Sequence, residues 1–446
     1  MFSVLLSASL ATIMASGQPK LEAGTRLYYQ GSVSLKADEA GTKSRKSFDL
    51  TLWVSRSMKR GVELYWVLDE RGHGGWPWSE RFGRLMLDRH LNGGMRGPSL
   101  LYERNDGRSV IPILLPIWSN QKKLKADARW EEDKTEYSVE RAAKEADREV
   151  WQVAVRNGYG LKRMLGVDQH GPLITSLIEK VTMDKGNEYQ LKMELVSAEK
   201  IPPDKFAPLS QAFVALLNMR NKISQPLDSQ EVVWKPTQLA LLRSELPKIE
   251  ELASKTVLEE LVASAKRDVE LQAGRSDALG DLARQHTGKP LPEFTLAEID
   301  GGSVTSKDLA GKVTVLHFWE YRAEPLKEPY GQVGYLDFLY QRRKDSGVQV
   351  YGVAVDGRLT DEMGKATAVR SVKKLKDFMN LSYPVLLDDG NVLKKFGDPR
   401  LVGAALPLFV VIGPDGKILE YHVGHYEVRQ DQGLTQLDQT VTTARK

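Results

Sequence analysis

The stretch KVTVLHFWEYRAEPLK, from Lys312 to Lys327, decides the fold of the C-terminal third of this chain. Its first half, which ends at Trp319, is a mostly apolar run rich in valine and aromatic residues, as is typical of a buried strand. A short polar loop follows, and Pro325 suits the first turn of a helix. We therefore predict a buried strand, a loop and a helix that begins near Pro325.

Further strand and turn motifs follow one another between Lys289 and about Gly433. They are PLPEFTL (290–296), DLAGK (308–312), VQVYGVAVD (348–356), YPVLLDD (383–389), ALP (405–407) and FVVIGPDGKI (409–418). The Asp-Gly pair in the last motif is typical of a hairpin turn between two strands. Together the motifs predict an α/β domain built on several short buried strands.

In this order the motifs resemble those of the TlpA/ResA-like thiol–disulfide oxidoreductases of the AhpC/TSA-redoxin superfamily. In that family, a strand that ends in a Phe-Trp pair leads into a CEPC or CPPC motif. The resemblance implies a thioredoxin-like α/β domain over residues 287–446. It also implies that Pro407 is a cis proline and that the residue before it offers backbone groups to an extended peptide.

Both redox cysteines of that motif are replaced in this chain. The four positions read Ala323, Glu324, Pro325 and Leu326, and the chain contains no cysteine at all. Thiol–disulfide exchange requires a thiolate that attacks and a second thiol that resolves the mixed disulfide. The family's acidic residue one turn later is also missing, since Pro329 occupies its place. We therefore predict no catalytic residue here and no enzyme, so that an oxidoreductase label would reflect ancestry only.

Three residues beside this motif are candidates for binding a partner: Trp319, Leu406 and Pro407. In one interpretation, a peptide groove around Ala323–Leu326 and Leu406–Pro407 is kept without thiol chemistry. In the other, the proline is kept only because the strand cannot close without it.

Residues 20–200 show apolar residues that alternate with a period of two, as in FDLTLWV (48–54) and YQLKMEL (189–195). Several such runs, separated by short polar turns, predict an antiparallel β-rich domain that is open or partly closed. We predict one helical insert, at Pro172–Glu179. The Trp- and Tyr-rich inner face resembles that of exported half-barrel carriers of lipidated cargo, which makes an apolar small ligand an alternative partner.

Residues 201–286 predict a helical connector, because apolar residues such as Leu246 and Ile249 recur at steps of three and four. Pro247 and Gly274 are predicted to break it into two or three helices. The predicted fold class is therefore multidomain α+β. It comprises an N-terminal antiparallel β-rich domain, this connector and a C-terminal thioredoxin-like α/β domain.

The first 17 residues predict a signal peptide, because an uncharged apolar run from Phe2 to Ala15 precedes the small residues Ser16 and Gly17. The basic residues that usually open such a peptide are missing, as a wrongly assigned start codon would explain. We expect a periplasmic or secreted protein, the alternative being a cytoplasmic protein with a frayed terminus. No other stretch approaches 18 apolar residues, so we expect a soluble mature protein.

Composition and charge bear on which partners and cofactors to expect. The net charge of +4, from 63 basic and 59 acidic side chains, gives no reason to expect a nucleic-acid partner. His317, His422 and His425 do not form a metal-ligand pattern, because residues three apart on a strand point to opposite faces. We predict neither a metal nor a cofactor.

Two stretches of the N-terminal domain could suggest a site. The aromatic residues of the string HGGWPWSE (73–80) would either stack against a bound ligand or pin this loop to the core. Glu70, Glu80 and Asp88 could suggest paired catalytic carboxylates, but acidic residues at this density usually form a solvated face. We therefore expect no hydrolase site.

The sequence thus predicts a redox-inactive, thioredoxin-like protein that binds a protein or peptide in the cell envelope, as a recognition or scaffolding module. One alternative is a carrier that holds an apolar ligand in the β-rich domain. Another is an accessory subunit that lends its groove to a cysteine-bearing partner.

Overall fold

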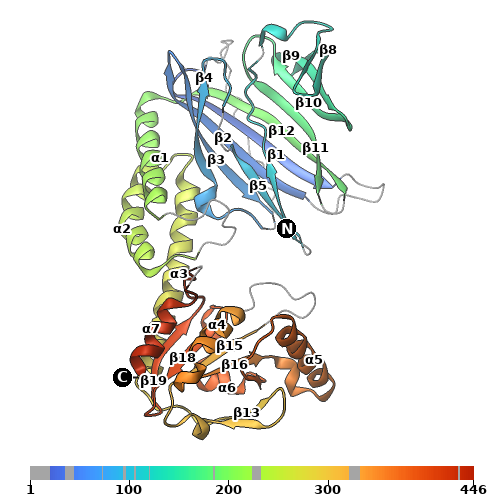
Figure 1. Ribbon diagram of the computed structural model, residues 1–446. Helices are drawn as coiled ribbons and strands as arrows, with labels where there is room; N and C mark the ends of the chain where they lie inside the picture. Colours follow the sequence, from blue (N-terminus) through green and yellow to red (C-terminus); the bar gives the residue numbers. More distant parts are fainter. Residues whose placement is uncertain are drawn as a thin grey trace, which may run out of the picture. The chain divides into compact units, whose positions relative to one another are not determined.

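The computed structural model describes residues 21–35, 45–72, 74–93, 97–104, 107–119, 121–183, 186–223, 233–320, 332–429 and 432–445. The chain forms two compact units, residues 1–269 and 270–446 (Figure 1). The signal peptide predicted for residues 1–17 lies outside the described residues. None of the helices in the described ranges is long and apolar enough to cross a membrane.

A ten-stranded antiparallel sheet forms most of the first unit, with the order β4-β3-β2-β1-β12-β11-β10-β9-β8-β7. Its strands are β1 (Thr25–Leu35), β2 (Arg45–Met58), β3 (Gly61–Arg71), β4 (Phe82–Asp88), β7 (Arg129–Glu132), β8 (Thr135–Glu145), β9 (Arg148–Asn157), β10 (Gly160–Asp168), β11 (Ile174–Met183) and β12 (Asn187–Lys200). Every paired neighbour is antiparallel, which confirms the predicted β-rich N-terminal fold.

The helical insert predicted at Pro172–Glu179 is wrong, because Ile174 opens the strand β11. Apolar residues spaced three and four apart, such as Leu173 and Leu177, suit a helix as well as a strand. In the structure, Leu177 is buried on the inner face while Ile178 is 42% exposed on the other face. This alternation is that of a strand paired on both sides, by β10 and β12.

The inner face of the sheet is filled by the chain's own hairpin, β5 (Ser99–Arg104) with β6 (Gly107–Pro112). Leu100, Tyr102 and Ile111 from this hairpin are buried in one apolar cluster with the inward residues of β1, β2, β3 and β12. The apolar inner surface that suggested a carrier is therefore covered, in this structure, by side chains of the same chain.

A buried ion pair joins this inner face to the segments that cross it. The ammonium group of Lys46 lies 3.2 Å from a carboxylate oxygen of Glu70, and both side chains are at most 2% exposed. Lys46 also donates to the carbonyls of Gly74 (3.0 Å) and Leu101 (2.7 Å). Glu70 accepts from the backbone amides of Trp76 (2.6 Å) and Leu101 (3.0 Å). The expectation of a solvated face is thus wrong for Glu70.

The loop over residues 74–80 is pinned to the core, which was one of its two predicted roles; His73 lies outside the described residues. Trp76 is 4% exposed and Trp78 is 2% exposed, so neither ring is offered to a ligand. The indole of Trp78 donates to the carboxylate of Asp268 at 3.1 Å.

Helices cover part of the opposite face of the sheet. Helix α1 (Pro203–Ile223) places the fully buried ring of Phe213 parallel to that of Tyr65, with ring centroids 4.1 Å apart. Trp53 and Phe82 meet the same ring edge-on, at 5.0 and 5.8 Å. Four aromatic rings from one helix and three strands therefore form this interface.

The helix breaks predicted at Pro247 and Gly274 are wrong. Helix α2 (Pro236–Ala253) runs through Pro247, and helix α3 (Glu259–His286) runs through Gly274. The buried apolar stripe of α2 continues on both sides of Pro247, through Leu246 and Ile249, and such packing outweighs a local propensity of a few kcal/mol at most. Beyond Gly274, α3 continues with partly buried residues such as Leu282. The chain instead turns between these helices, where Lys255 adopts a left-handed backbone conformation.

The second unit is a thioredoxin-like α/β domain around a seven-stranded mixed sheet, which confirms the predicted C-terminal fold. The sheet order is β14-β13-β17-β16-β15-β18-β19. The strands are β13 (Thr295–Glu298), β14 (Ser303–Thr305), β15 (Thr314–Trp319), β16 (Gln349–Val355), β17 (Val385–Asp388), β18 (Leu408–Ile412) and β19 (Ile418–Val423). The helices are α4 (Val333–Arg343), α5 (Glu362–Phe378), α6 (Asn391–Lys395) and α7 (Thr435–Ala444).

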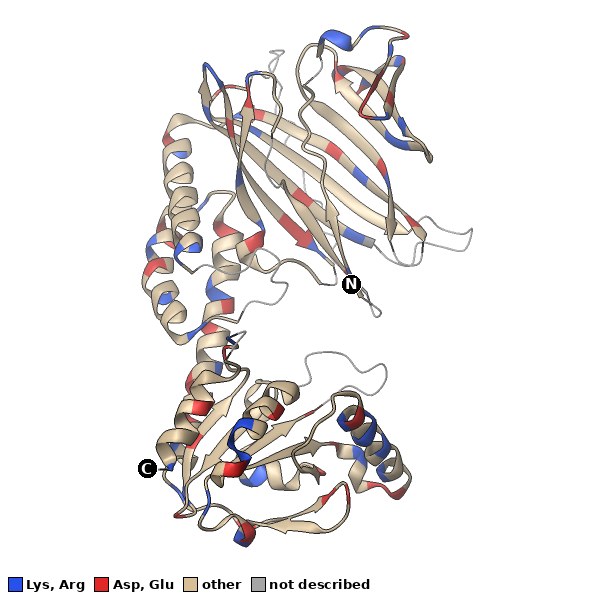
Figure 2. Ribbon diagram, viewed as in Figure 1, with Lys and Arg blue, Asp and Glu red and all other residues tan. Residues whose placement is uncertain are grey.

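Two apolar layers cover this sheet. Buried residues of α4, α5 and α7 form one layer, while α6 and the last turns of α3 contribute to the other. Figure 2 shows basic and acidic residues interspersed over most elements, with a concentration of lysine and arginine on α5. The interspersed charges agree with the small net charge of the chain.

Candidate functional site

The candidate site lies at one end of the central strand of the second unit. β15 pairs antiparallel with β18, and Phe318 is opposite Leu408 in the register. Glu320, which follows β15, is therefore at the same end of the sheet as the residues that precede β18. The peptide bond between Leu406 and Pro407 is cis, as the family resemblance implied.

The four positions of the lost cysteine motif, Ala323, Glu324, Pro325 and Leu326, lie outside the described residues, which stop at Glu320 and resume at Gln332. The three predicted binding residues are described. Trp319 is only 1% exposed and lies against Tyr383 and Gly352, where an added Cβ would approach both rings closely. Its ring therefore supports the site from within the core and does not line a surface.

Of the three predicted binding residues, Leu406 is the most accessible. It is half-buried, while Pro407 is buried and its carbonyl accepts a hydrogen bond from the amide of Gly424 at 2.8 Å. Within the described part of the chain, neither the amide nor the carbonyl of Leu406 has a hydrogen-bond partner. Leu406 thus presents a backbone donor and acceptor directly before the strand ladder begins.

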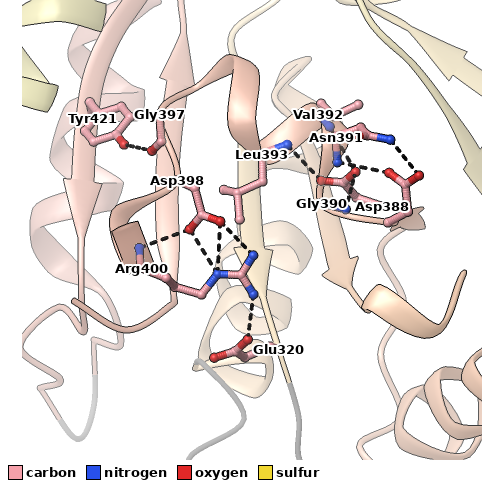
Figure 3. A network of polar contacts seen from close by, with 11 residues as sticks. Glu320, Asp388, Gly390, Asn391, Val392, Leu393, Gly397, Asp398, Arg400 and Tyr421 are labelled. Atoms are coloured by element: carbon pink, nitrogen blue, oxygen red, sulfur yellow. Dashed lines mark hydrogen bonds and ion pairs between the residues drawn. The ribbon is translucent and has the colours of Figure 1, made fainter. Parts of the chain in front are cut away.

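A charged bridge, which the sequence reasoning missed, connects this loop to the end of β15 (Figure 3). Arg400 binds Asp398 through two nitrogens, at 2.9 and 2.8 Å, and donates a third hydrogen bond to Glu320 at 3.0 Å. Asp398 also accepts from the backbone amide of Arg400 at 3.0 Å. A planar guanidinium that binds carboxylates from two segments fixes their spacing.

The ionisation of the bridge follows from its contacts. Burial disfavours the charged form of Asp398, but the hydrogen bonds and the charge of Arg400 outweigh it and lower the pKa of that carboxyl. The same hydrogen bonds raise the pKa of Arg400. The only signal in the sequence is the Asp-Pro-Arg string at 398–400, and it does not identify Glu320 as a partner.

We expect this pair to make stability depend on pH. Because the pKa of Asp398 is lower in the folded chain, its contribution is complete above about pH 4 and is lost as the pH falls through the folded value. The variant Asp398→Asn should therefore be less stable at pH 7 and decline less between pH 5 and pH 2. Urea denaturation at each pH measures this, with Asp345→Asn, an exposed surface change, as the control. Equal slopes for the wild type and Asp398→Asn would contradict the assignment.

Asp388, next to this bridge in Figure 3, has a structural role. Its carboxylate accepts from the backbone amides of Gly390, Val392 and Leu393 at 2.8–3.0 Å and so caps α6. Burial raises the pKa of Asp388, although these three hydrogen bonds act in the opposite direction. It orders the chain between β17 and α6 and is not available to a partner.

The histidines of this unit lie in aromatic surroundings. His317 is fully buried and stacks on Phe409 with ring centroids 4.4 Å apart. His422 stacks on Tyr426 at 3.9 Å, and burial lowers its pKa. No group of three or more potential metal ligands is found among the residues that the structure describes.

The fold, the cis proline and the absence of cysteine define a thioredoxin-like domain without redox thiols. The model of the AhpC/TSA family matches residues 287–421. The thiol–disulfide oxidoreductase ResA of Bacillus cereus (strain ZK) is 30% identical over 156 residues, which cover 35% of this chain and 80% of that protein. ResA of Bacillus thuringiensis (strain Al Hakam) is 29% identical over 154 residues, covering 34% and 79%. The chain belongs, through its C-terminal third, to this ResA-related AhpC/TSA family.

A solved structure with similarity to this domain is that of a thiol:disulfide interchange protein of the thioredoxin family from Chlorobium tepidum TLS. It is 19% identical, with a TM-score of 0.28, and the match covers 35% of this chain and 97% of that one. These comparisons concern the C-terminal domain only.

Proposed function

We propose that this protein is a non-catalytic binding module of the cell envelope, whose thioredoxin-like domain recognises an extended polypeptide at the cis-proline loop. The observation that carries the proposal is that the backbone amide and carbonyl of Leu406 have no partner among the described residues, in a chain that has no cysteine. An extended peptide can pair with such a donor and acceptor without any thiol. The family's thiol chemistry would then have been lost while its recognition surface was kept.

The bridge of Arg400 supports this proposal. It joins the loop that carries Asp398 to Glu320 at the end of β15, so two walls of the site are connected by charge-assisted hydrogen bonds. A preorganised loop loses less conformational entropy on binding than a mobile one. Recognition of a peptide backbone does not need the lost sulfur atoms.

The protein would act in the periplasm or outside the cell, because a signal peptide is predicted for residues 1–17. An apolar ligand in the β-rich domain is the less favoured function, because Leu100, Tyr102 and Ile111 already pack on the inner face. A partner that supplies its own cysteines would be one particular occupant of the same loop.

We expect Leu406→Glu to weaken binding of an unfolded polypeptide at least about tenfold, because a charge would enter the half-buried contact beside the backbone groups. The probe is reduced, carboxymethylated α-lactalbumin, which has no free thiol, and biosensor titration of the full chain gives the dissociation constant. Leu401→Glu is the matched control, because Leu401 is 81% exposed on the same segment. Equal dissociation constants for both variants, or no binding by the wild type, would contradict the proposed function.

A further inference from the structure

The strand β19 is the outer edge of the seven-stranded sheet. In an antiparallel ladder, successive residues turn their backbone groups alternately toward the neighbouring strand and away from it. The amide of Gly424 donates to the carbonyl of Pro407, and the carbonyl of Lys417 accepts from the amide of Gly413. On the β19 side, Gly424 and Lys417 therefore turn these backbone groups toward β18. With the register shift near Leu419, the residues that face outward are Ile418, Tyr421 and Val423.

The chain itself already uses the first part of this edge. The carbonyl of Ile418 accepts from the amide of Gly288 at 2.7 Å, and its amide donates to the carbonyl of Lys289 at 2.9 Å. Farther along, the outward backbone groups of Tyr421 and Val423 have no hydrogen-bond partner among the residues that the structure describes. An edge of this kind is a template for another strand.

A groove of about 660 Å³ lies between β19 and α7. Its helical wall is formed by one face of α7, where Gln436, Gln439, Thr440 and Thr443 follow each other at steps of three, one and three residues. The apolar face of the same helix, with Leu437 and Val441, is buried in the core. The groove wall is thus uncharged and rich in amides and hydroxyls.

The floor of the groove is held by ring and hydrogen-bond contacts. The hydroxyl of Tyr426 donates to a carboxylate oxygen of Glu420 at 2.6 Å, and the ring of His422 stacks on that of Tyr426. The Nε2 atom of His422 is buried and has no partner among the described residues. No lysine or arginine is found among the described residues that line the groove, so an acidic occupant would gain no counter-charge there.

We infer that the β19–α7 groove binds a neutral, extended peptide segment that adds as a strand to Tyr421 and Val423. The main chain of the peptide hydrogen-bonds to the outward backbone groups of Tyr421 and Val423, and every second side chain of the peptide faces α7. The amides and hydroxyls of α7 select Asn, Gln, Ser or Thr at those positions. This site is separate from the cis-proline loop, and it does not depend on the function proposed above.

The test uses the full chain and a fluorescent form of the peptide acetyl-QVTVQVT-amide. We expect saturable binding below 1 mM and at least fivefold slower hydrogen exchange at the amides of Tyr421 and Val423. The same peptide N-methylated at every internal amide should not bind, because its internal backbone amides can no longer donate to the edge of β19. No binding up to 1 mM, or binding without protection of these two amides, would overturn the inference.

Variants distinguish binding in the groove from nonspecific binding of the peptide elsewhere on the protein. The double variant Gln436→Ala and Gln439→Ala should raise the dissociation constant of the peptide at least tenfold. Alanine favours the helix, so α7 is retained. Gln432→Ala, an exposed glutamine outside the groove, is the matched control. Leu406→Glu should leave this binding unchanged. Equal affinity of the double variant and the wild type, or loss of binding in Leu406→Glu, would reject the groove as the site.

Discussion

Replacing Lys46 by methionine should lower the free energy of unfolding of the first unit by about 3–5 kcal/mol, the range for breaking a buried ion pair. The side chain of Lys46 is 2% exposed, and its ammonium group lies between the carboxylate of Glu70 and two backbone carbonyls. Without it, the charge of Glu70 stays buried with no cation beside it. Urea denaturation followed by tryptophan fluorescence measures the change in the free energy of unfolding.

Two controls locate the cause of this effect. Lys144→Met removes an exposed lysine from β8 and should change the free energy of unfolding by less than about 0.5 kcal/mol. The double variant Lys46→Met and Glu70→Gln should recover part of the loss, because glutamine removes the buried charge and keeps an acceptor for a backbone amide. A loss below about 1 kcal/mol in Lys46→Met would show that the pair is not buried as described.

Replacing Phe213 by alanine should cost about 3–5 kcal/mol, the range for deleting a buried phenylalanine ring. The ring is fully buried and contacts Tyr65, Trp53 and Phe82, so its loss leaves a cavity between α1 and the sheet. Differential scanning calorimetry and urea denaturation measure the change.

The next residue on the same helix is the control for this prediction. Val214 is 40% exposed, so Val214→Ala removes little buried surface and should have a small effect. Equal effects of Phe213→Ala and Val214→Ala would contradict the packing of α1 on this face of the sheet.

The thioredoxin-like domain could be predicted because its strands are short, apolar and marked by turn residues in a fixed order. The run from Phe409 to Ile418 is an example, since β18, its turn and the start of β19 fall where the motif placed them. The cis bond at Pro407 followed from the same resemblance. Local patterns suffice where each strand is buried on both faces.

Local patterns failed where tertiary pairing decides the structure. The residues from Pro172 to Glu179 suit a helix by their spacing, but pairing with β10 and β12 makes them part of a strand. Pro247 and Gly274 are weak helix formers, but α2 and α3 run through them, and the buried face of α2 continues across Pro247. In both cases, burial of apolar surface exceeds the local propensity.

The polar contacts of both units were beyond sequence reasoning. Lys46 and Glu70 meet because β2 and β3 pair in a particular register and the segments at Gly74 and Leu101 cross them. Glu320 and Arg400 are 80 residues apart in the chain, and nothing in their surroundings marks them as partners. Charged pairs have no periodicity, so only the folded chain identifies them.

The most direct test of the central claim is hydrogen exchange of the full chain, resolved to single amides, with and without carboxymethylated α-lactalbumin. If the thioredoxin-like domain recognises polypeptide at the cis-proline loop, exchange of the Leu406 amide should slow at least fivefold when the probe is saturating. The amide of Leu401 should be unchanged. Binding that leaves the Leu406 amide exchanging at its free rate would contradict the account.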